Sequence, residues 1–282
     1  MNPILAVSLK EFQDSLRNRW FVSITVIFAL LSIGLSYYGS VASGHIGTPS
    51  LSSTIASLSS LSVFIIPLIA LLLCYDSFVG EQESGTLLLL MTYPISHGQL
   101  LLGKFIGQGS VIALATILGF GSAALLLSFT TDTEGVAGTF SLFILTSILL
   151  GLCFIALAYV ISLLVSEKSK AAGIALMLWL FFVLAFDLAL LALLVGTEDM
   201  VTQQGLVQMM MLNPADLFRL INLSSLSSSD VNGALAVAIN SSLPTSTLIV
   251  AMFGWIIVPL GAAQIIFRKK PYRGFYADKE IR

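Results

Sequence analysis

The chain has 282 residues, of which 57% are hydrophobic and only 10% are charged, and its mean hydropathy is +0.98. Soluble domains carry about a quarter of charged residues, so this composition excludes a water-soluble globule. A formal net charge of −2 argues against a nucleic-acid partner, which would require clustered Lys and Arg. Cys74 and Cys153 both lie in apolar stretches, which excludes a disulfide framework and a zinc site with paired thiolates.

Residues 1–19 precede the first long apolar run and are predicted to form an amphipathic helix along the membrane surface. The apolar residues recur at helical spacing, and charged residues fall mostly between them: Leu5, Leu9, Phe12, Leu16 and Trp20. A cleaved signal peptide is the alternative, with Ser40 and Ala42 as a small-residue cleavage site. The long charged leader and long apolar run fit that alternative poorly, so we expect an uncleaved span.

Six stretches are long and apolar enough to cross a hydrocarbon core of about 30 Å as helices. We therefore predict an all-α, polytopic membrane protein with six transmembrane helices. The predicted spans are about 20–39, 56–78, 101–128, 140–165, 171–195 and 246–267.

The basic residues orient these spans. If the amino terminus is cytoplasmic, twelve of the 13 Lys and Arg residues fall inside and only Arg219 falls outside, as the positive-inside rule requires. The predicted parts are a cytoplasmic interfacial helix at 1–19, a transmembrane domain at 20–267 and a cytoplasmic basic tail at 268–282. The transmembrane domain includes an inner loop at 80–100 and an outer loop at 196–245, in which we expect short helices that dip into the membrane.

The inner loop holds the densest polar segment on the cytoplasmic side. Its acidic start suits a helix amino terminus, its leucines supply an apolar face and Pro94 ends the turn. Physics alone leaves two interpretations open: a knob that receives force from a soluble subunit, or an interfacial linker. Gly98 to Lys104 has the spacing of a phosphate-binding loop, but Phe105 replaces the required Ser or Thr. Ser96 and Gln99 instead predict a capping box before the third span, with Lys104 held near the headgroups.

The same segment resembles the signature of ABC-2 type permeases. The matching features are acidic residues, a Gly-Thr pair, a leucine run, a proline and a Gly-Lys pair: Glu81, Glu83, Gly85, Thr86, Leu87 to Leu90, Pro94, Gly103 and Lys104. Together with the surface helix, the six spans and the long outer loop, the resemblance covers essentially the whole chain. It implies a permease fold of the type V exporter kind in a bacterial inner membrane, with both termini cytoplasmic.

A narrower resemblance, to the permeases of copper-processing ABC complexes that serve nitrous oxide reductase, rests on Tyr75 to Glu81, on Gly85 to Pro94 and especially on Asn213 to Leu223. It implies a homodimer bound to two separate ATPase subunits inside and to a periplasmic copper-handling subunit outside. The chain itself would be non-catalytic and bind no cofactor directly, with ATP and Mg on the ATPase and copper on the periplasmic partner. We expect the ATPase to be met by Glu81, Glu83, Gly85, Thr86, Pro94, Glu167 and Lys168.

On the outer side, the sequence leaves two interpretations open for each polar residue. Arg219 either pairs with Asp216 three residues before it on a helix or, with Asn213, Pro214 and Asp216, presents a polar edge to the periplasmic partner. Asp187 in the fifth span is either a switch or cation site, or the partner in an interhelical bond.

No metal site is expected. Met209 to Met211 are three consecutive residues that a helix directs about 100° apart, so they do not converge on one copper ion. The alternative functions are a generic ABC-2 exporter of a lipid, drug or ion, a secondary transporter and a structural membrane anchor. A secondary transporter is disfavoured because the sequence has no evident repeated halves.

Overall fold

The structure is a computed structural model that describes residues 2–17, 23, 25–34, 51–130, 136–196, 202–224 and 244–269. These residues are almost entirely helical and contain no strand. The helices are α1 (Pro3–Arg17), α3 (Leu51–Cys74), α4 (Val79–Glu83), α5 (Thr86–Thr92), α6 (His97–Thr130), α7 (Val136–Leu164), α8 (Lys168–Leu180), η1 (Phe181–Ala185), α9 (Phe186–Gly196), α10 (Gln203–Met210), α11 (Pro214–Ser224) and α13 (Thr245–Lys269).

Five helical stretches are long and apolar enough to cross a membrane: Thr54–Glu83, His97–Ser128, Ala137–Leu164, Lys168–Gly196 and Thr245–Lys269. The all-α, multi-pass prediction is therefore confirmed, and these five stretches coincide with predicted spans to within a few residues. Of the first predicted span, at 20–39, the structure describes an apolar helical segment, Thr25–Gly34, and Ser23. The count of six stays a prediction, because the rest of that span lies outside the described residues.

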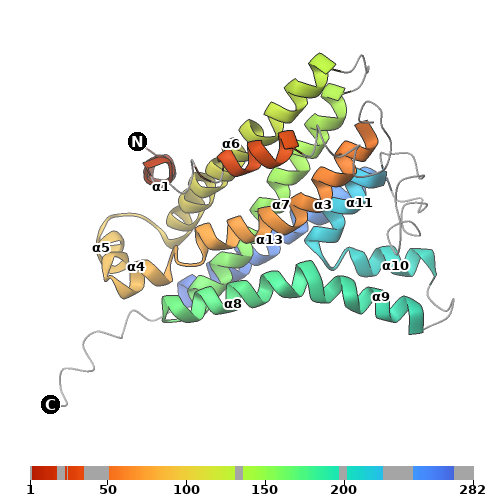
Figure 1. Cartoon of the computed structure of the whole chain (residues 1–282). Coiled ribbons are helices and arrows are strands. Elements are labelled where there is room, and N and C mark those ends of the chain that lie inside the picture. Colours follow the sequence, from red (N-terminus) through yellow and green to blue (C-terminus); the bar gives the residue numbers. More distant parts are fainter. Residues whose placement is uncertain are drawn as a thin grey trace.

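Helix α7 forms the centre of the bundle. It packs against α3, α6 and α13, and also contacts α8 and α11 (Figure 1). Its large side chains Phe143, Phe154 and Tyr159 are fully buried. The rings of Phe143 and Phe120 of α6 lie 4.8 Å apart, so aromatic packing contributes to the contact between these helices.

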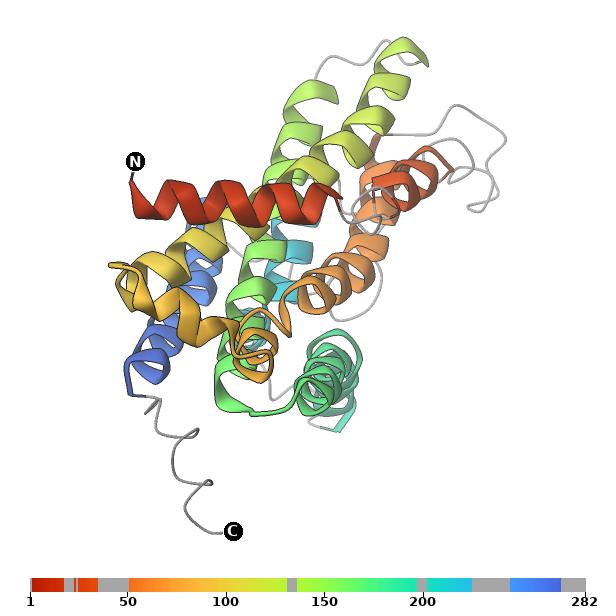
Figure 2. The same ribbon diagram turned by 90° about the vertical axis from the view of Figure 1, so that its left-hand side faces the viewer.

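One end of the bundle collects the segments that the sequence places in the cytoplasm. Figure 1 shows α1, α4, α5 and the start of α8 at this end. The ring of Phe267, near the end of α13, lies 5.2 Å from Phe78 and 4.9 Å from His97 at the start of α6. Figures 1 and 2 show α1 lying crosswise to the long helices. Its apolar residues Leu5 and Leu9 are about half exposed, a pattern typical of a helix at a membrane surface.

The predicted outer loop contains two short helices, α10 and α11. Helix α11 contacts α3, α7, α13 and η1, and nearly all of its side chains are buried. It is therefore packed among the spans, and its entry into the membrane stays a prediction.

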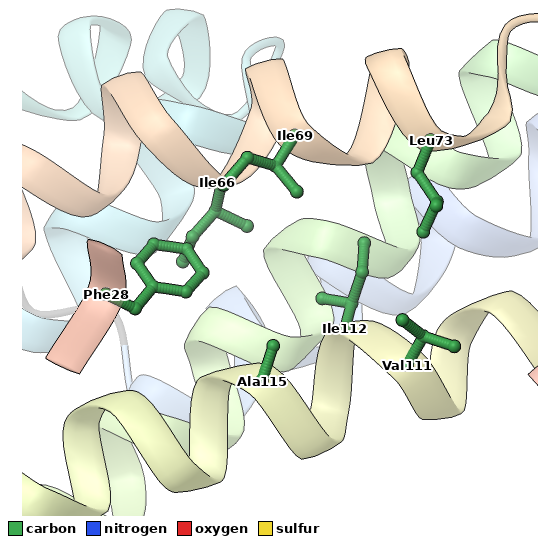
Figure 3. A pocket seen from close by; sticks show the side chains of 7 residues that line it. All are labelled: Phe28, Ile66, Ile69, Leu73, Val111, Ile112 and Ala115. Atoms are coloured by element: carbon green, nitrogen blue, oxygen red, sulfur yellow. The ribbon is translucent and has the colours of Figure 1, made fainter. Parts of the chain in front are cut away.

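A small pocket lined entirely by apolar side chains lies between α3 and α6. Ile66, Ile69 and Leu73 project from α3 toward Val111, Ile112 and Ala115 of α6, and Phe28 approaches from the Thr25–Gly34 segment (Figure 3). Its lining offers no polar group to orient a ligand, so we treat it as a packing feature.

Candidate functional site

The inner loop folds into two short helices instead of the single one predicted. Gly85 separates α4 from α5 and has a φ angle of 74°, in the left-handed region that favours glycine. A Cβ atom at Gly85 would meet nothing within 4 Å, so the backbone angle, not a close approach within the chain, explains the residue.

Helix α4 is fastened to α7 by Ser162. The hydroxyl oxygen of Ser162 accepts hydrogen bonds from the backbone N–H groups of Phe78 and Val79, at 3.0 Å each. These two N–H groups belong to the first turn of the α4 segment, where no helical acceptor exists. A side chain from a different span thus supplies the cap of the short helix.

A second connection joins α4 to the start of α8. Glu83 Oε1 accepts a hydrogen bond of 2.7 Å from the backbone N–H of Lys168, and the ammonium of Lys168 lies 3.3 Å from Asp76 Oδ2. A Cβ atom on Gly80 would lie 2.5 Å from Cε of Lys168, so a larger residue at this position would displace the end of the Lys168 side chain. The structure therefore joins two of the residues predicted separately, Glu83 and Lys168. Glu167 is exposed and pairs with Lys170 at 2.6 Å.

The third connection is a buried charge cluster. The ammonium of Lys104 in α6 lies 2.7 Å from Glu81 Oε1 of α4 and 3.0 Å from Glu11 Oε1 of α1. Only 3% of the Lys104 side chain is exposed, and the ring of Phe78 lies 5.7 Å from the ammonium. The expectation that Lys104 is held near the headgroups is wrong, because its two carboxylate partners retain it inside the protein. Glu81 likewise turns inward.

No sequence pattern identified the polar residues that lie behind this cluster. Gln108 Nε2 donates to Ser77 Oγ at 2.8 Å and to Glu11 Oε2 at 3.4 Å, while Gln108 Oε1 accepts from the Tyr159 hydroxyl at 2.8 Å. Each residue alone resembles an ordinary member of an apolar span. These residues lie within one or two helical turns of the charge cluster. Their proximity to one another becomes evident only when α6 and α7 are packed together.

Beyond α4, helix α5 is a protruding apolar tip. Leu87 is buried against the core, whereas Leu88, Leu89 and Tyr93 are exposed, with Leu89 at 65%. Thr86 binds the carbonyl of Glu81, which closes the corner between the helices. Exposed neighbouring leucines on a polar loop are typical of a docking surface for another protein or a membrane.

The connection to α6 follows the predicted capping box. The backbone N–H of Gln99 donates to Ser96 Oγ at 3.2 Å, and the backbone N–H of Ser96 donates to Gln99 Oε1 at 2.9 Å. Pro94 lies two residues after the end of α5 and forces extended backbone on Tyr93, whose ψ is 153°. The capping box prediction is confirmed.

A second polar cluster lies at the fifth span. Arg219 of α11 donates from one nitrogen to Asp187 Oδ2 of α9 and to Asp216 Oδ1, the latter at 3.1 Å. Asn213 Nδ2 donates to Asp216 Oδ2 at 3.0 Å, and Asn213 Oδ1 caps α11 by accepting from the backbone N–H of Ala215. Both structural interpretations are realised: the local Asp216–Arg219 pair and the interhelical bond of Asp187.

These contacts differ from a polar edge on an outer surface. Asn213 is fully buried, Asp216 is 1% exposed and Pro214 is also buried. Only Arg219 of the four predicted partner-binding residues is partly exposed, at 17% of its side chain. Direct contact of Asn213, Pro214 or Asp216 with another protein would thus require α11 to move.

The three consecutive methionines diverge, as their helical spacing predicts. Met209 is exposed, Met210 is buried and Met211 is partly buried, its carbonyl accepting a 3.1 Å bond from Trp255 Nε1. Among the described residues, no three His, Cys, Asp or Glu side chains gather in a way that would hold a metal ion.

Comparison with known proteins decides the family. The chain matches the model of the ABC-2 family transporter proteins over residues 5–271. The chain belongs to this family. It is 48% identical over 274 residues to the probable ABC transporter permease protein NosY of Pseudomonas aeruginosa, an alignment that covers 96% of this chain and 100% of that protein. The probable NosY permease of Stutzerimonas stutzeri is 47% identical over 276 residues, covering 96% of this chain and 99% of that protein.

The ABC-2 resemblance drawn from the inner loop is thereby confirmed, as is its narrower form toward NosY permeases. The chain is the permease subunit of an ABC transporter and a multi-pass membrane protein. This membership decides against the secondary transporter and the structural membrane anchor.

Proposed function

We propose that this permease couples ATP hydrolysis by a separate, NosF-like ATPase to a periplasmic, NosD-like copper-handling subunit, and so serves maturation of the copper centre of nitrous oxide reductase. The permease would act as a homodimer with two ATPase copies in a bacterial inner membrane, with both termini cytoplasmic. The resemblance to NosY permeases over 96% of the chain supports this reading.

The observation that carries the coupling role is the construction of the α4–α5 corner. Its apolar tip is exposed through Leu88 and Leu89, while α4 beneath it is bonded to α6, α7 and α8 through Glu81, Ser162 and Glu83. Because α4 is bonded to three spans, a force applied to the α5 tip would be transmitted to all of them. A loop that only lies at the membrane interface does not need these bonds. We propose that Glu81, Glu83 and Lys168, which the sequence predicts to meet the ATPase, act as anchors. The contact surface would be formed by Leu88 and Leu89, which that prediction did not include.

We propose that the exposed pair Glu167 and Lys170 forms a second contact with the ATPase. Both side chains are more than half exposed, at 54% and 64%, and they begin α8 beside the residue that Glu83 caps. The inner face would then present two contact surfaces, the apolar tip of α5 and the charged turn before α8. The hydrogen bond between Glu83 and Lys168 would join them.

At the outer end, we propose that one group of residues acts by positioning α11: Asn213, Pro214, Asp216 and Arg219. It holds α11 against the fifth span, and the periplasmic subunit would contact exposed neighbours such as Leu212, which is 63% exposed between α10 and α11. The copper-handling role of that subunit is inferred from the resemblance to NosY permeases alone.

The test is a gentle-detergent purification of the tagged chain from its native host, with mass spectrometry of copurifying proteins and ATPase assays. We compare Leu89→Asp with Leu212→Asp, an equal substitution at a similarly exposed leucine of the opposite end. Leu89→Asp should lose the ATPase and keep the periplasmic partner, and Leu212→Asp should do the reverse.

The outcomes separate the candidate functions. An ATPase together with a periplasmic copper-binding protein supports copper-centre maturation. An ATPase without a periplasmic partner points to an ABC-2 exporter of another cargo, which transport assays in vesicles would identify. Absence of any ATPase from the wild-type preparation contradicts the coupling role.

A further inference from the structure

Helix α1 is seated on α6 by contacts that leave no space between the two backbones. A Cβ atom on Gly103 would lie 2.7 Å from Cβ of Val7, and one on Gly107 would lie 2.8 Å from the carbonyl oxygen of Ser8. Two glycines four residues apart thus form a groove on α6 that receives α1. The close approach of α1 and α6 at Gly103 and Gly107 therefore occurs within one chain.

This packing of α1 on α6 places Glu11 of α1 beside the α4–α5 corner, here termed the coupling corner. Glu11 and Glu81 both bind the ammonium of Lys104, at 3.0 and 2.7 Å, and their side chains are only 12% and 18% exposed. Two carboxylates this close and this buried would repel one another without the cation between them. Lys104 therefore converts a repulsive pair into a bridge between α1 and α4.

The two carboxylates differ in their dependence on the bridge. Glu11 Oε2 also accepts a bond from Gln108 at 3.4 Å, so α1 keeps one further polar contact with α6. Glu81 Oε2 is buried and has no hydrogen-bond partner among the residues that the structure describes. The link from the coupling corner to α1 thus passes through the Lys104 ammonium.

We propose that Lys104 is a positioning residue that makes α1 move together with the coupling corner during the ATPase cycle. The inference rests on the proposed coupling role. Because α1 lies crosswise to the spans and exposes Leu5 and Leu9, such a movement would be delivered to the membrane surface as well as to α6.

The experiment uses the full chain with its ATPase in lipid nanodiscs. Spin labels are placed on pairs of introduced cysteines, Leu5→Cys with Val258→Cys and Gln82→Cys with Val258→Cys; Leu5 and Val258 are exposed, Gln82 of α4 is partly exposed, and the two native cysteines are fully buried. Distances are measured without nucleotide and with a non-hydrolysable ATP analogue. Position 258, on α13, is the reference for both, because α1 is packed on α6 and Lys104 is part of α6.

In the wild type, nucleotide should shift both distances. Lys104→Met should keep the shift at position 82 and abolish the shift at position 5. Lys10→Met is the matched control, because Lys10 on α1 is 57% exposed and its carboxylate partners lie 3.6 Å away; both shifts should survive this substitution.

Lys104→Met leaves two unbalanced carboxylates and could prevent assembly. The triple variant Glu11→Gln/Glu81→Gln/Lys104→Met removes the ionic bridge and the repulsion together, and it should also lose the shift at position 5. A shift at position 5 that persists in either variant, or is absent from the wild type while position 82 responds, overturns the role of Lys104. No response at position 82 in the wild type, or no copurifying ATPase, overturns the proposed coupling role and this inference with it.

Discussion

The side-chain amide of Asn213 donates a hydrogen bond of 2.8 Å to the carbonyl oxygen of Phe182, inside the fifth span. This carbonyl lies in the π-helical turn η1, where the N–H of Phe186 binds the carbonyl of Phe181 instead of that of Phe182. The turn therefore deprives Phe182 of its α-helical donor, and Asn213 replaces it. Helix α11 is held to the fifth span by this bond and by the Arg219–Asp187 pair.

Asn213→Leu should destabilise the permease by about 1–3 kcal/mol, because it leaves the Phe182 carbonyl and the Asp216 carboxylate without their amide donor. Thermal unfolding in detergent, followed by the fluorescence of a thiol-reactive dye at the buried cysteines, measures the change. Gln208→Leu removes an amide from an exposed site of α10 and is the control. An equal loss in both variants would contradict the assigned role of Asn213.

The stability of the wild type should fall as pH rises from about 5 to 8. Burial and the neighbouring Asp187 carboxylate raise the pKa of Asp216 to about 8, although Arg219 opposes the shift. Since the folded state then binds more protons than the unfolded state, stability is greatest at low pH and is lost as pH approaches the folded-state pKa.

Asp216→Asn should flatten this pH dependence. Unfolding temperatures at several pH values between 5 and 8 provide the measurement, and Asp14→Asn, at a carboxylate 57% exposed on α1, should keep the wild-type slope. An unchanged slope in Asp216→Asn would mean that another group titrates.

Gly85→Ala should weaken the α4–α5 corner by about 1–2 kcal/mol, because an L-residue at a φ of 74° is strained even where its Cβ has space. Gly85→Asn should be milder, since asparagine tolerates the left-handed region. Binding of the ATPase to the purified permease is the readout. Gly173→Ala, in a helix where the Cβ also meets nothing, should bind as the wild type does.

Ser162→Ala should cost about 1–3 kcal/mol, because two buried N–H groups of Phe78 and Val79 lose their acceptor. Ser110→Ala is the matched control, since the exposed Ser110 hydroxyl bonds only the carbonyl of Ile106 in its own helix. Hydrogen exchange at the α4 amides distinguishes the two variants, because only Ser162→Ala should reduce their protection. An equal loss of protection in both variants would contradict the capping role of Ser162.

Much of the architecture could be predicted because lipid imposes simple local rules. Apolar length alone located the stretches that became α3, α6, α7, α8 with α9, and α13. The spacing of Ser96 and Gln99 predicted their capping box, since both partners lie within one helical turn. The signature from Glu81 to Lys104 identified the family, and the family match over residues 5–271 bears it out.

The partners of the charged residues could not be predicted, because they come from distant parts of the chain. The bond between Lys104 and Glu11 spans 93 positions in the sequence, and that between Lys168 and Glu83 spans 85. Local patterns assign a lysine near a span end to the headgroups and an aspartate on a short helix to the surface. In a medium without water, however, buried charges take whichever opposite charge the packing brings near.

The sequence by itself therefore determined the membrane solvent, the family and the position of the inner loop, all of which depend on composition and local order. Only the tertiary structure decided what the polar residues do. Lys104 joins α1 to α4, Glu83 accepts a backbone N–H at the start of α8, and Asn213 donates to a carbonyl of the π-helical turn. The physical reason is that a polar group excluded from water must find a partner within about 3 Å, and that distance is set by how helices pack.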